Sequence, residues 1–253
     1  MNTDIVAIGA ARTAIGSFGG TLKYTRVYDL GAAAMKAAMA RAGIVPDMID
    51  QAIVAHCRQA GNGPNASRTA AVRAGVPLDR PTFTVNMACP SGIKAAMLAS
   101  RELAAGDAKT ILVGGMESMS TMPYMLQGVR WDGFRAGDKI LQDAWADAID
   151  PLTGYGMGIT AENLVEKYGL TRAEQDQFES QQKAAKAQAA GLTKPEIVPF
   201  DLEPTRKNPD GVRFEVDESL RVNTTLEGLG KLRASFKESG GSVTAGNACA
   251  MGD

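Results

Sequence analysis

Cys89 has the most informative chemical setting of any residue in this chain, because it lies in the stretch VNMACPSGIKAA at 85–96. Residues 81–85 have the β-branched and apolar character of a strand, and residues 91–106 have that of a helix. Cys89 is therefore predicted at a strand-to-helix turn, at or next to the helix N-cap. Free N–H groups and the helix dipole stabilise an anion there, which favours the nucleophilic thiolate.

The neighbours of Cys89 suit a reactive turn. Pro90 fits the first helical position, where its missing N–H loses nothing. Ser91 and Gly92 are small, so a substrate could approach the backbone closely. The alternative is a buried, unreactive cysteine, which is the common state of a single cysteine. Motifs elsewhere in the chain are needed to distinguish these two interpretations.

The elements that would position Cys89 alternate along the first 120 residues. Strands are expected at 4–10, 51–55, 81–85 and 109–115, and helices at 28–42, 64–74 and 91–106. Strands separated by helices predict an α/β fold with a mostly parallel sheet, covered by helices on both faces. Ligands bind beyond the carboxyl ends of such strands. Cys89, Gly114 and Gly115 all lie at that edge.

The pattern changes after residue 120. Residues 121–155 are rich in Gly, Met, Asp and Trp without a clear period, and residues 221–239 are polar and weakly patterned. Helices are expected at 158–168 and 171–190, and strands at 194–201 and 212–216. Thr171 and Glu174 have the spacing of a capping box. We therefore predict a core at 1–120, an inserted α+β loop subdomain at 121–242, and a return segment at 243–253 that leads toward a further strand.

Composition excludes several classes of protein. The chain has 253 residues, of which 45% are hydrophobic and 22% charged, as in ordinary soluble globular proteins. A net charge of -1 argues against a nucleic-acid-binding surface, and no apolar run could span a bilayer. Three widely spaced cysteines fit a reducing compartment, so a cytoplasmic location is expected. Met1 directly precedes the first expected strand, which leaves no room for a signal peptide.

Several motifs, in chain order, resemble the thiolase family. VNMACPSGIKA at 85–95 resembles the family's nucleophile turn, and VGGMESMSTMPY at 113–124 resembles the segment after the following strand. GMGITAENLVEKYGLTRAEQDQF at 156–178 resembles the helical part of its loop domain, which KLRASF at 231–236 and GSVTAGNA at 241–248 complete. Ketosynthases share the fold and the cysteine, but the inserted subdomain with GITAEN favours a thiolase.

This resemblance implies acyl transfer through Cys89. The thiolate would attack the thioester of an acyl-CoA, or the keto carbonyl of a 3-ketoacyl-CoA in the cleavage direction, and form an acyl-enzyme. In the synthetic direction the enolate of acetyl-CoA would take the acyl group. Coenzyme A and acyl-CoA are then substrates, and no permanent cofactor and no metal are expected. Pro90 replaces a glycine common in the family but leaves the Cys89 N–H free to serve in an oxyanion hole.

Four residues of the loop subdomain match positions that contact coenzyme A in thiolases. They are Met157, Arg221, Phe236 and Cys249. Two departures from the family pattern stand out, since Gly156 replaces a usual histidine and Cys249 replaces a usual serine. Both changes remove polar contacts to coenzyme A, so affinity or acyl preference should differ. The alternative for each residue is packing within an irregular loop.

Thiolases consist of two similar halves, and the resemblance covers only the N-terminal half with its loop domain. The second half contributes an Asn, a His and an acid/base Cys in NEAF-like, GHP-like and CGGG-like motifs, and none of these motifs occurs here. His56, in AHCRQAGNG, matches none of them and is interpreted as an internally satisfied turn histidine. Cys57 and Cys249 likewise match no acid/base motif.

A nucleophile without its base loses most of its rate, so we predict a split enzyme. A second protein chain would supply the C-terminal half, in a hetero-oligomer expected to be a heterotetramer. Residues 126–138 resemble the region that forms the larger assembly in thiolases. Neither nucleic acid nor membrane is expected as a partner. Two alternatives remain: a non-catalytic acyl-CoA-binding or scaffolding subunit, and a fragment of a full-length thiolase.

Overall fold

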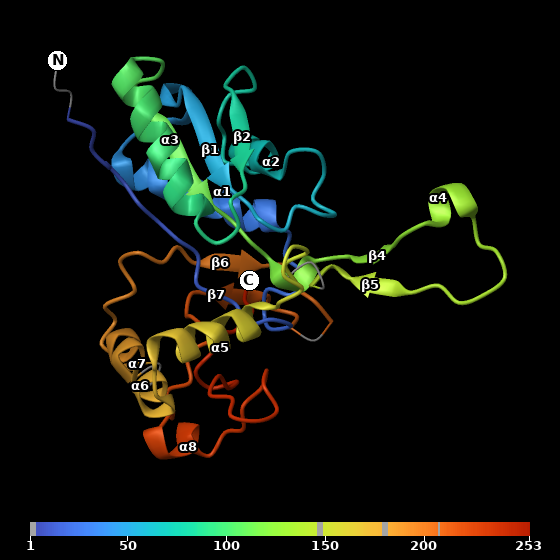
Figure 1. The fold of residues 1–253 in the computed structure, drawn as a ribbon. Coiled ribbons are helices and arrows are strands. Elements are labelled where there is room, and N and C mark those ends of the chain that lie inside the picture. Colours follow the sequence, from blue (N-terminus) through green and yellow to red (C-terminus); the bar gives the residue numbers. More distant parts are fainter. Residues whose placement is uncertain (1–3, 146–148, 179–181, 207) are drawn as a thin grey trace. The chain divides into compact units, whose positions relative to one another are not determined.

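The structure is a computed structural model that describes residues 4–145, 149–178, 182–206 and 208–253 (Figure 1). The chain divides into two compact units. The first unit comprises Met1–Thr121, Thr193–Glu218 and Gly252–Asp253, and the second comprises Met122–Leu192 and Ser219–Met251. Residues 193–218 fall inside the predicted loop subdomain yet pack with the first unit, where Ile197 and Phe214 join Ala14, Leu22 and Leu30 in one buried cluster.

A three-stranded parallel sheet is the centre of the first unit, in the order β2-β1-β3. Its strands are β1 (Gln51–Ala55), β2 (Thr82–Val85) and β3 (Ile111–Gly115), close to the predicted ranges. Ala55 pairs with both Val85 and Gly115, so the three strands end in one row. This register gathers the residues that follow each strand at a single edge of the sheet.

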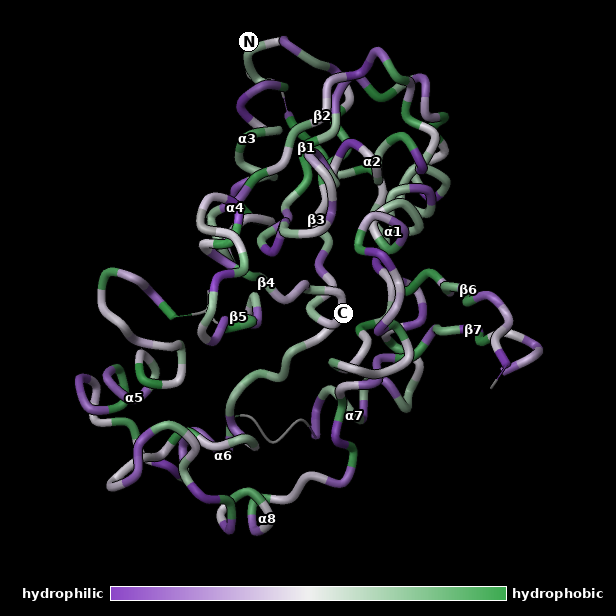
Figure 2. The backbone as a smooth tube through the Cα atoms, turned by 90° about the vertical axis from the view of Figure 1, so that its right-hand side faces the viewer, coloured by the Kyte–Doolittle hydropathy of each residue, from purple (hydrophilic) through white to green (hydrophobic). Residues whose placement is uncertain are grey.

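Helices cover both faces of this sheet, as predicted (Figure 1). Ala52 and Val54 of β1 pack in a cluster with α1 (Val27–Ala42) and α2 (Ala66–Arg73). Ile53, between them, packs in another cluster with α3 (Ser91–Ala105). Alternate residues of a strand point to opposite faces, so α3 lies on the face opposite α1 and α2. Residues 52–55 of β1 are all apolar and buried, as a strand covered on both faces must be (Figure 2).

The helix ends follow the expected capping chemistry. α1 ends at Gly43 and α3 at Gly106, both in the left-handed conformation that glycine adopts without strain. α2 begins later than predicted because the Asn65 side chain caps it, accepting a hydrogen bond of 2.9 Å from the Arg68 N–H. α3 begins at Ser91, so Pro90 occupies the N-cap and not the first helical position that we predicted.

The predicted strand at residues 4–10 is wrong. The segment runs outside any strand, and Ile5, Val6 and Ile8 are exposed. It passes close to α1 at Gly9, where an added Cβ would lie 2.7 Å from the Ala38 carbonyl oxygen. An apolar run becomes a strand only when another strand accepts its hydrogen bonds, and none of the described residues pairs with this segment.

A small antiparallel ribbon completes the first unit. β6 (Phe200–Leu202) pairs with β7 (Val212–Phe214). The strand predicted at 194–201 is therefore wrong over most of its length, because residues 191–196 form turns. The strand predicted at 212–216 is confirmed for its first three residues. Two 3-10 helices, η1 (Pro46–Met48) and η2 (Met119–Thr121), also belong to this unit.

The second unit is built from short elements. The antiparallel strands β4 (Tyr124–Leu126) and β5 (Leu141–Asp143) flank α4 (Val129–Asp132), and the other helices are α5 (Met157–Tyr168), α6 (Arg172–Phe178), α7 (Gln182–Ala189) and α8 (Leu226–Gly230). α5 confirms the helix predicted at 158–168. Within the helix predicted at 171–190, the structure has the helices α6 and α7. Residues 179–181 of that prediction lie outside the described ones.

The predicted capping box is confirmed at the start of α6. The Thr171 N–H donates to Glu174 Oε2 at 2.8 Å, and the Glu174 N–H donates to Thr171 Oγ1 at 3.2 Å. Over the described ranges, every helix lacks the length or the apolar character needed to cross a bilayer.

Candidate active site

The row of strand ends in the first unit forms the candidate site. His56 and Cys57 follow β1, residues 86–89 follow β2, and Met116 and Glu117 follow β3. These segments line one cavity of about 450 Å³. The parallel register therefore brings together residues that are far apart in the sequence, at the edge where such sheets bind ligands.

The turn that carries Cys89 is held in an unusual conformation. Ala88 has a φ of 54°. No other non-glycine residue among the described ones has a positive φ. Its carbonyl oxygen accepts from Ser91 Oγ at 2.5 Å, and Ser91 Oγ in turn accepts from the Met87 N–H at 2.7 Å. The Asn86 side chain accepts from the Ala88 N–H at 3.0 Å. A left-handed alanine costs about 1–3 kcal/mol, and such strain is concentrated at functional sites.

Cys89 presents an accessible thiol at this turn. It is a free, exposed cysteine that directly precedes the N-cap of α3 and lines the cavity. A Cβ added at Gly92 would meet nothing within 4 Å, so the space over the first turn of α3 is open. The predicted strand-to-helix position is confirmed, and the thiol is exposed in this chain.

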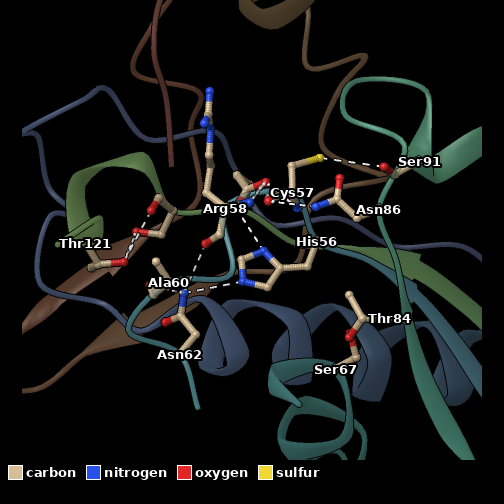
Figure 3. A network of polar contacts seen from close by, with 12 residues as sticks. His56, Cys57, Arg58, Ala60, Asn62, Ser67, Thr84, Asn86, Ser91 and Thr121 are labelled. Atoms are coloured by element: carbon tan, nitrogen blue, oxygen red, sulfur yellow. Dashed lines mark hydrogen bonds and ion pairs between the residues drawn. The ribbon is translucent and has the colours of Figure 1, made fainter. Parts of the chain in front are cut away.

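A second thiol lies beside the same turn. Cys57 Sγ is 3.1 Å from the Ala88 carbonyl oxygen and 3.7 Å from Ser91 Oγ, and Figure 3 shows the sulfur directed toward Ser91. The Asn86 amide donates to the Cys57 carbonyl oxygen at 3.0 Å, which links the turns after β1 and β2. Burial is the main cause that raises the pKa of the Cys57 thiol, so it stays protonated at neutral pH.

His56 and Glu117 support these turns from inside the unit. The His56 ring is 1% exposed, with Nδ1 2.9 Å from Glu117 Oε1 and Nε2 3.3 Å from the Asn62 amide nitrogen (Figure 3). Glu117 also accepts from the backbone N–H groups of Cys57, at 2.9 Å, and Arg58, at 3.3 Å. Burial raises the pKa of Glu117, but His56 and these two donors outweigh it and leave the pKa below its ordinary value. The structure agrees with our interpretation of His56 as an internally paired turn histidine.

The residues predicted to contact coenzyme A all lie in the second unit. The Phe236 ring lies over the start of α5, since a Cβ added at Gly158 would be 2.1 Å from it. Met157 begins α5 and, like Phe236, is exposed. Arg221 is exposed at a turn in which its carbonyl oxygen accepts from the Thr224 hydroxyl at 2.7 Å, and Cys249 is an exposed free thiol.

Sequence reasoning missed the closeness of Cys57 to the nucleophile turn. The signal was present, because Cys57 and Cys89 each follow a predicted strand. Their contact, however, depends on β1 and β2 being neighbours in the sheet, which the order of strands in the chain does not show.

The chain is similar to known proteins over almost its whole length. The family model "Thiolase, N-terminal domain" matches residues 5–253. An acetyl-CoA acetyltransferase of Cupriavidus necator is 46% identical over 99% of this chain, and a probable acetyl-CoA acyltransferase of Staphylococcus epidermidis is 46% identical over 98%. The chain spans 64% and 63% of the lengths of these relatives.

Solved structures show the same fold. Acetyl-CoA acetyltransferases from Bacillus anthracis and Syntrophomonas wolfei both align with a TM-score of 0.92, at 37% and 38% identity. Each alignment covers 98% of this chain and 62% of the solved chain. The predicted thiolase-like α/β fold is therefore confirmed.

Proposed function

Because the chain belongs to the thiolase family, matching that family's N-terminal domain, we propose that it carries the nucleophile of an acyl-CoA acyltransferase. The observation that carries the proposal is the exposed Cys89 thiol, in a cavity at the carboxyl ends of three parallel strands. The names of the relatives agree, since they describe acetyl-CoA acetyltransferases and an acyltransferase.

The proposed chemistry is covalent catalysis at Cys89. The thiolate attacks the thioester carbonyl of an acyl-CoA, a new C–S bond forms, and the thiolate of coenzyme A leaves. In the cleavage direction it attacks the keto carbonyl of a 3-ketoacyl-CoA, and the acetyl-CoA carbanion leaves and is protonated. A second coenzyme A then takes the acyl group. In the synthetic direction acetyl-CoA is the acceptor, in a Claisen condensation. Coenzyme A thus acts as a substrate and no resident cofactor is needed.

The nucleophile turn has features that suit an oxyanion hole. Pro90 has no N–H of its own, but it follows Cys89 and does not affect the Cys89 N–H. That N–H remains available to a developing negative charge. The strained Ala88 sets the direction of that peptide. A preorganised donor of this kind is worth about 2.7–4 kcal/mol of transition-state stabilisation.

We assign the binding of coenzyme A to the second unit, through Met157, Arg221, Phe236 and Cys249. The exposed Phe236 ring lies over Gly158, and the exposed Met157 is the preceding residue at the start of α5, so both can offer apolar contacts to a pantetheine chain. The Arg221 guanidinium has the geometry that phosphate groups prefer. Cys249 offers a thiol where thiolases have a hydroxyl, which weakens a polar contact.

The proton-handling groups should come from a second chain that carries the C-terminal thiolase half, in a heterotetramer. Two observations support this. The His, Asn and Cys motifs of that half do not occur in this sequence. A groove of about 430 Å³ beside β3 is lined by apolar residues of 5–11, α1, α3 and β3, including the exposed Ile5 and Val113. Among the described residues β3 pairs only with β1, and such an edge accepts an added strand.

The ribbon formed by β4, α4 and β5 is the proposed contact for the larger assembly. The segment predicted for this contact, residues 126–138, lies within the ribbon. Trp131 and Phe134 in that segment are 87% and 77% exposed. Exposed aromatic side chains in one short segment are typical of protein–protein contacts. We expect Trp131→Ser to lower the mass of the assembly in light scattering without a change in helix content.

Thiolysis of acetoacetyl-CoA tests the proposed function. The chain alone should show no sustained turnover, and activity should appear when the remaining third of the Cupriavidus necator relative is added as a separate polypeptide or fused to Asp253. Cys89→Ser should abolish that activity. Full turnover by the chain alone would contradict the need for further residues, and activity in the fused Cys89→Ser protein would contradict the role of Cys89.

Two measurements distinguish the alternatives. A copurifying chain with its own nucleophile turn would favour an acyl-CoA-binding or scaffolding subunit. A native polypeptide mass that includes a C-terminal half would place the His, Asn and second Cys on the same chain, as in an ordinary thiolase.

A further inference from the structure

Two thiols line the candidate cavity, although acyl transfer uses only one nucleophile. Cys89 is exposed and Cys57 is partly exposed, so small reagents can reach both. They follow neighbouring strands of the sheet and lie on turns that the Asn86 side chain connects. No motif of the proposed function accounts for the thiol at Cys57.

The geometry limits how far apart the two cysteines can be. Cys57 Sγ lies 3.1 Å from the Ala88 carbonyl oxygen, which belongs to the peptide that joins Ala88 to Cys89. By standard peptide dimensions, that sulfur is therefore at most about 6 Å from the Cα of Cys89. In a disulfide the corresponding separation is roughly 3–4.5 Å. To enter this range, the distance from the Cys57 sulfur to the Cys89 Cα would have to shorten by at most about 1.5 Å.

The contacts that hold the Cys57 sulfur in place are weak. A thiol is a poor hydrogen-bond donor, and Ser91 already donates to the same Ala88 oxygen through both its hydroxyl and its backbone N–H. Moving the Cys57 sulfur away therefore leaves the Ala88 carbonyl satisfied. The open space over Gly92 leaves room for the Cys89 side chain to turn.

We propose that Cys57 and Cys89 form a reversible dithiol–disulfide pair, which makes this cavity a site of oxidative modification by hydroperoxides. The Cys89 thiolate attacks the peroxide, an S–O bond forms, the O–O bond breaks, and the leaving oxygen is released as water or an alcohol. Cys57 then attacks the sulfur of the sulfenic acid. The S–S bond forms, the S–O bond breaks, and the Cys57 proton leaves with hydroxide as water. Two thiols are oxidised and one peroxide is reduced.

This pairing would protect the nucleophile. A solitary sulfenic acid at an exposed position is oxidised further to sulfinic acid, which cellular thiols do not reduce. A disulfide with Cys57 stops that sequence and returns to two thiols with a reductant. The cavity would thus switch between an acyl-accepting and an inactive, protected state.

The test uses the 253-residue chain with Cys249→Ser, in which Cys57 and Cys89 are the only cysteines. After treatment with hydrogen peroxide, we expect both thiols to become unreactive toward iodoacetamide together and the mass to fall by two hydrogen atoms. Peptide mapping should find residues 57 and 89 cross-linked within one chain, and dithiothreitol should restore both thiols. A gain of two oxygen atoms on Cys89 with Cys57 still alkylated would overturn the proposal.

The matched variant adds Cys57→Ser to the same protein. Without the second thiol, we expect Cys89 to be lost irreversibly as sulfinic acid at peroxide doses that leave the parent fully recoverable. Equal recovery in both proteins would contradict the pairing. Acetylation of the reduced parent by acetyl-CoA is measured in parallel, so that a failure of the disulfide is distinguished from a failure of Cys89 as the acyl acceptor.

Discussion

The two units hold their proposed functional residues in different ways. In the first unit the Cys89 turn depends on the register of three parallel strands, reinforced by uncharged hydrogen bonds from Asn86 and Ser91. In the second unit buried carboxylates hold the short elements together. Glu162 of α5, 3% exposed, accepts from the N–H groups of Ser242 and Val243 at 2.8 and 2.7 Å.

A second carboxylate in that unit acts in the same way. Asp176 of α6 is buried, pairs with Arg172, and accepts from the Asn247 amide at 3.0 Å. The segments that carry Phe236 and Cys249 therefore depend on ionised groups, whereas the turn that carries Cys89 depends on backbone pairing. We expect the contacts of Glu162 and Asp176 to be more sensitive to single substitutions than the backbone pairing that holds the Cys89 turn.

The largest expected effect is at Cys89. Cys89→Ser should slow acyl-enzyme formation from acetyl-CoA by at least about 10³-fold. The reason is that a serine hydroxyl does not ionise at neutral pH and is a much weaker nucleophile than a thiolate. Cys249→Ser should still form the acyl-enzyme, and bind coenzyme A more tightly, because it restores the hydroxyl. Rapid-quench mass spectrometry gives both rates, and equal rates for Cys89→Ser and the parent would contradict the assignment.

Glu162 gives the largest expected effect on stability in the second unit. Glu162→Gln should lower the free energy of unfolding by about 2–3 kcal/mol, because a buried charge-assisted contact to two N–H groups is weakened. Glu166→Gln on the same helix is the matched control, because its pair with Lys237 is exposed and should contribute little. Urea titrations compare the two, and equal losses would contradict the role of Glu162.

Acid should act on the same carboxylate. Burial raises the pKa of Glu162, but the Val243 and Ser242 donors outweigh it and leave the pKa below its ordinary value. A depressed folded-state pKa gives stability that is present above the unfolded pKa of about 4.3 and lost as the pH falls below it. Circular dichroism from pH 6 to 3 should show a smaller loss for Glu162→Gln than for the parent. An equal loss of signal in Glu162→Gln and the parent would contradict Glu162 as the cause of the acid sensitivity.

The smallest expected effect concerns the strained turn of the first unit. Ala88→Gly should stabilise the protein by about 1 kcal/mol, because glycine adopts a φ of 54° without strain. Ala96→Gly, at an exposed position inside α3, is the control and should destabilise by about 1 kcal/mol. Thermal unfolding measures both, and a loss of stability with Ala88→Gly would show that the turn is not strained.

The same difference between the units explains what the sequence could predict. The strands of the sheet and α1 to α3 carry clear apolar periods and glycine stops such as Gly43 and Gly106, so their existence and the strand-to-helix setting of Cys89 follow from local pattern. The segment 4–10 has the composition of a strand, but a strand also needs a partner, which composition does not supply. The proximity of Cys57 to Cys89 depends on the order of strands in the sheet. The contacts of Glu162 and Asp176 join segments about 70 to 80 residues apart and have no local signal.

The most direct test of the central claim is the location of the acyl group after the reduced chain is incubated with [1-¹⁴C]acetyl-CoA and digested under mildly acidic conditions. Cys89 should carry the label, in a thioester that hydroxylamine removes. Label on Cys57 or Cys249, or a chain that stays unlabelled even when it is joined to a C-terminal thiolase half, would contradict the account.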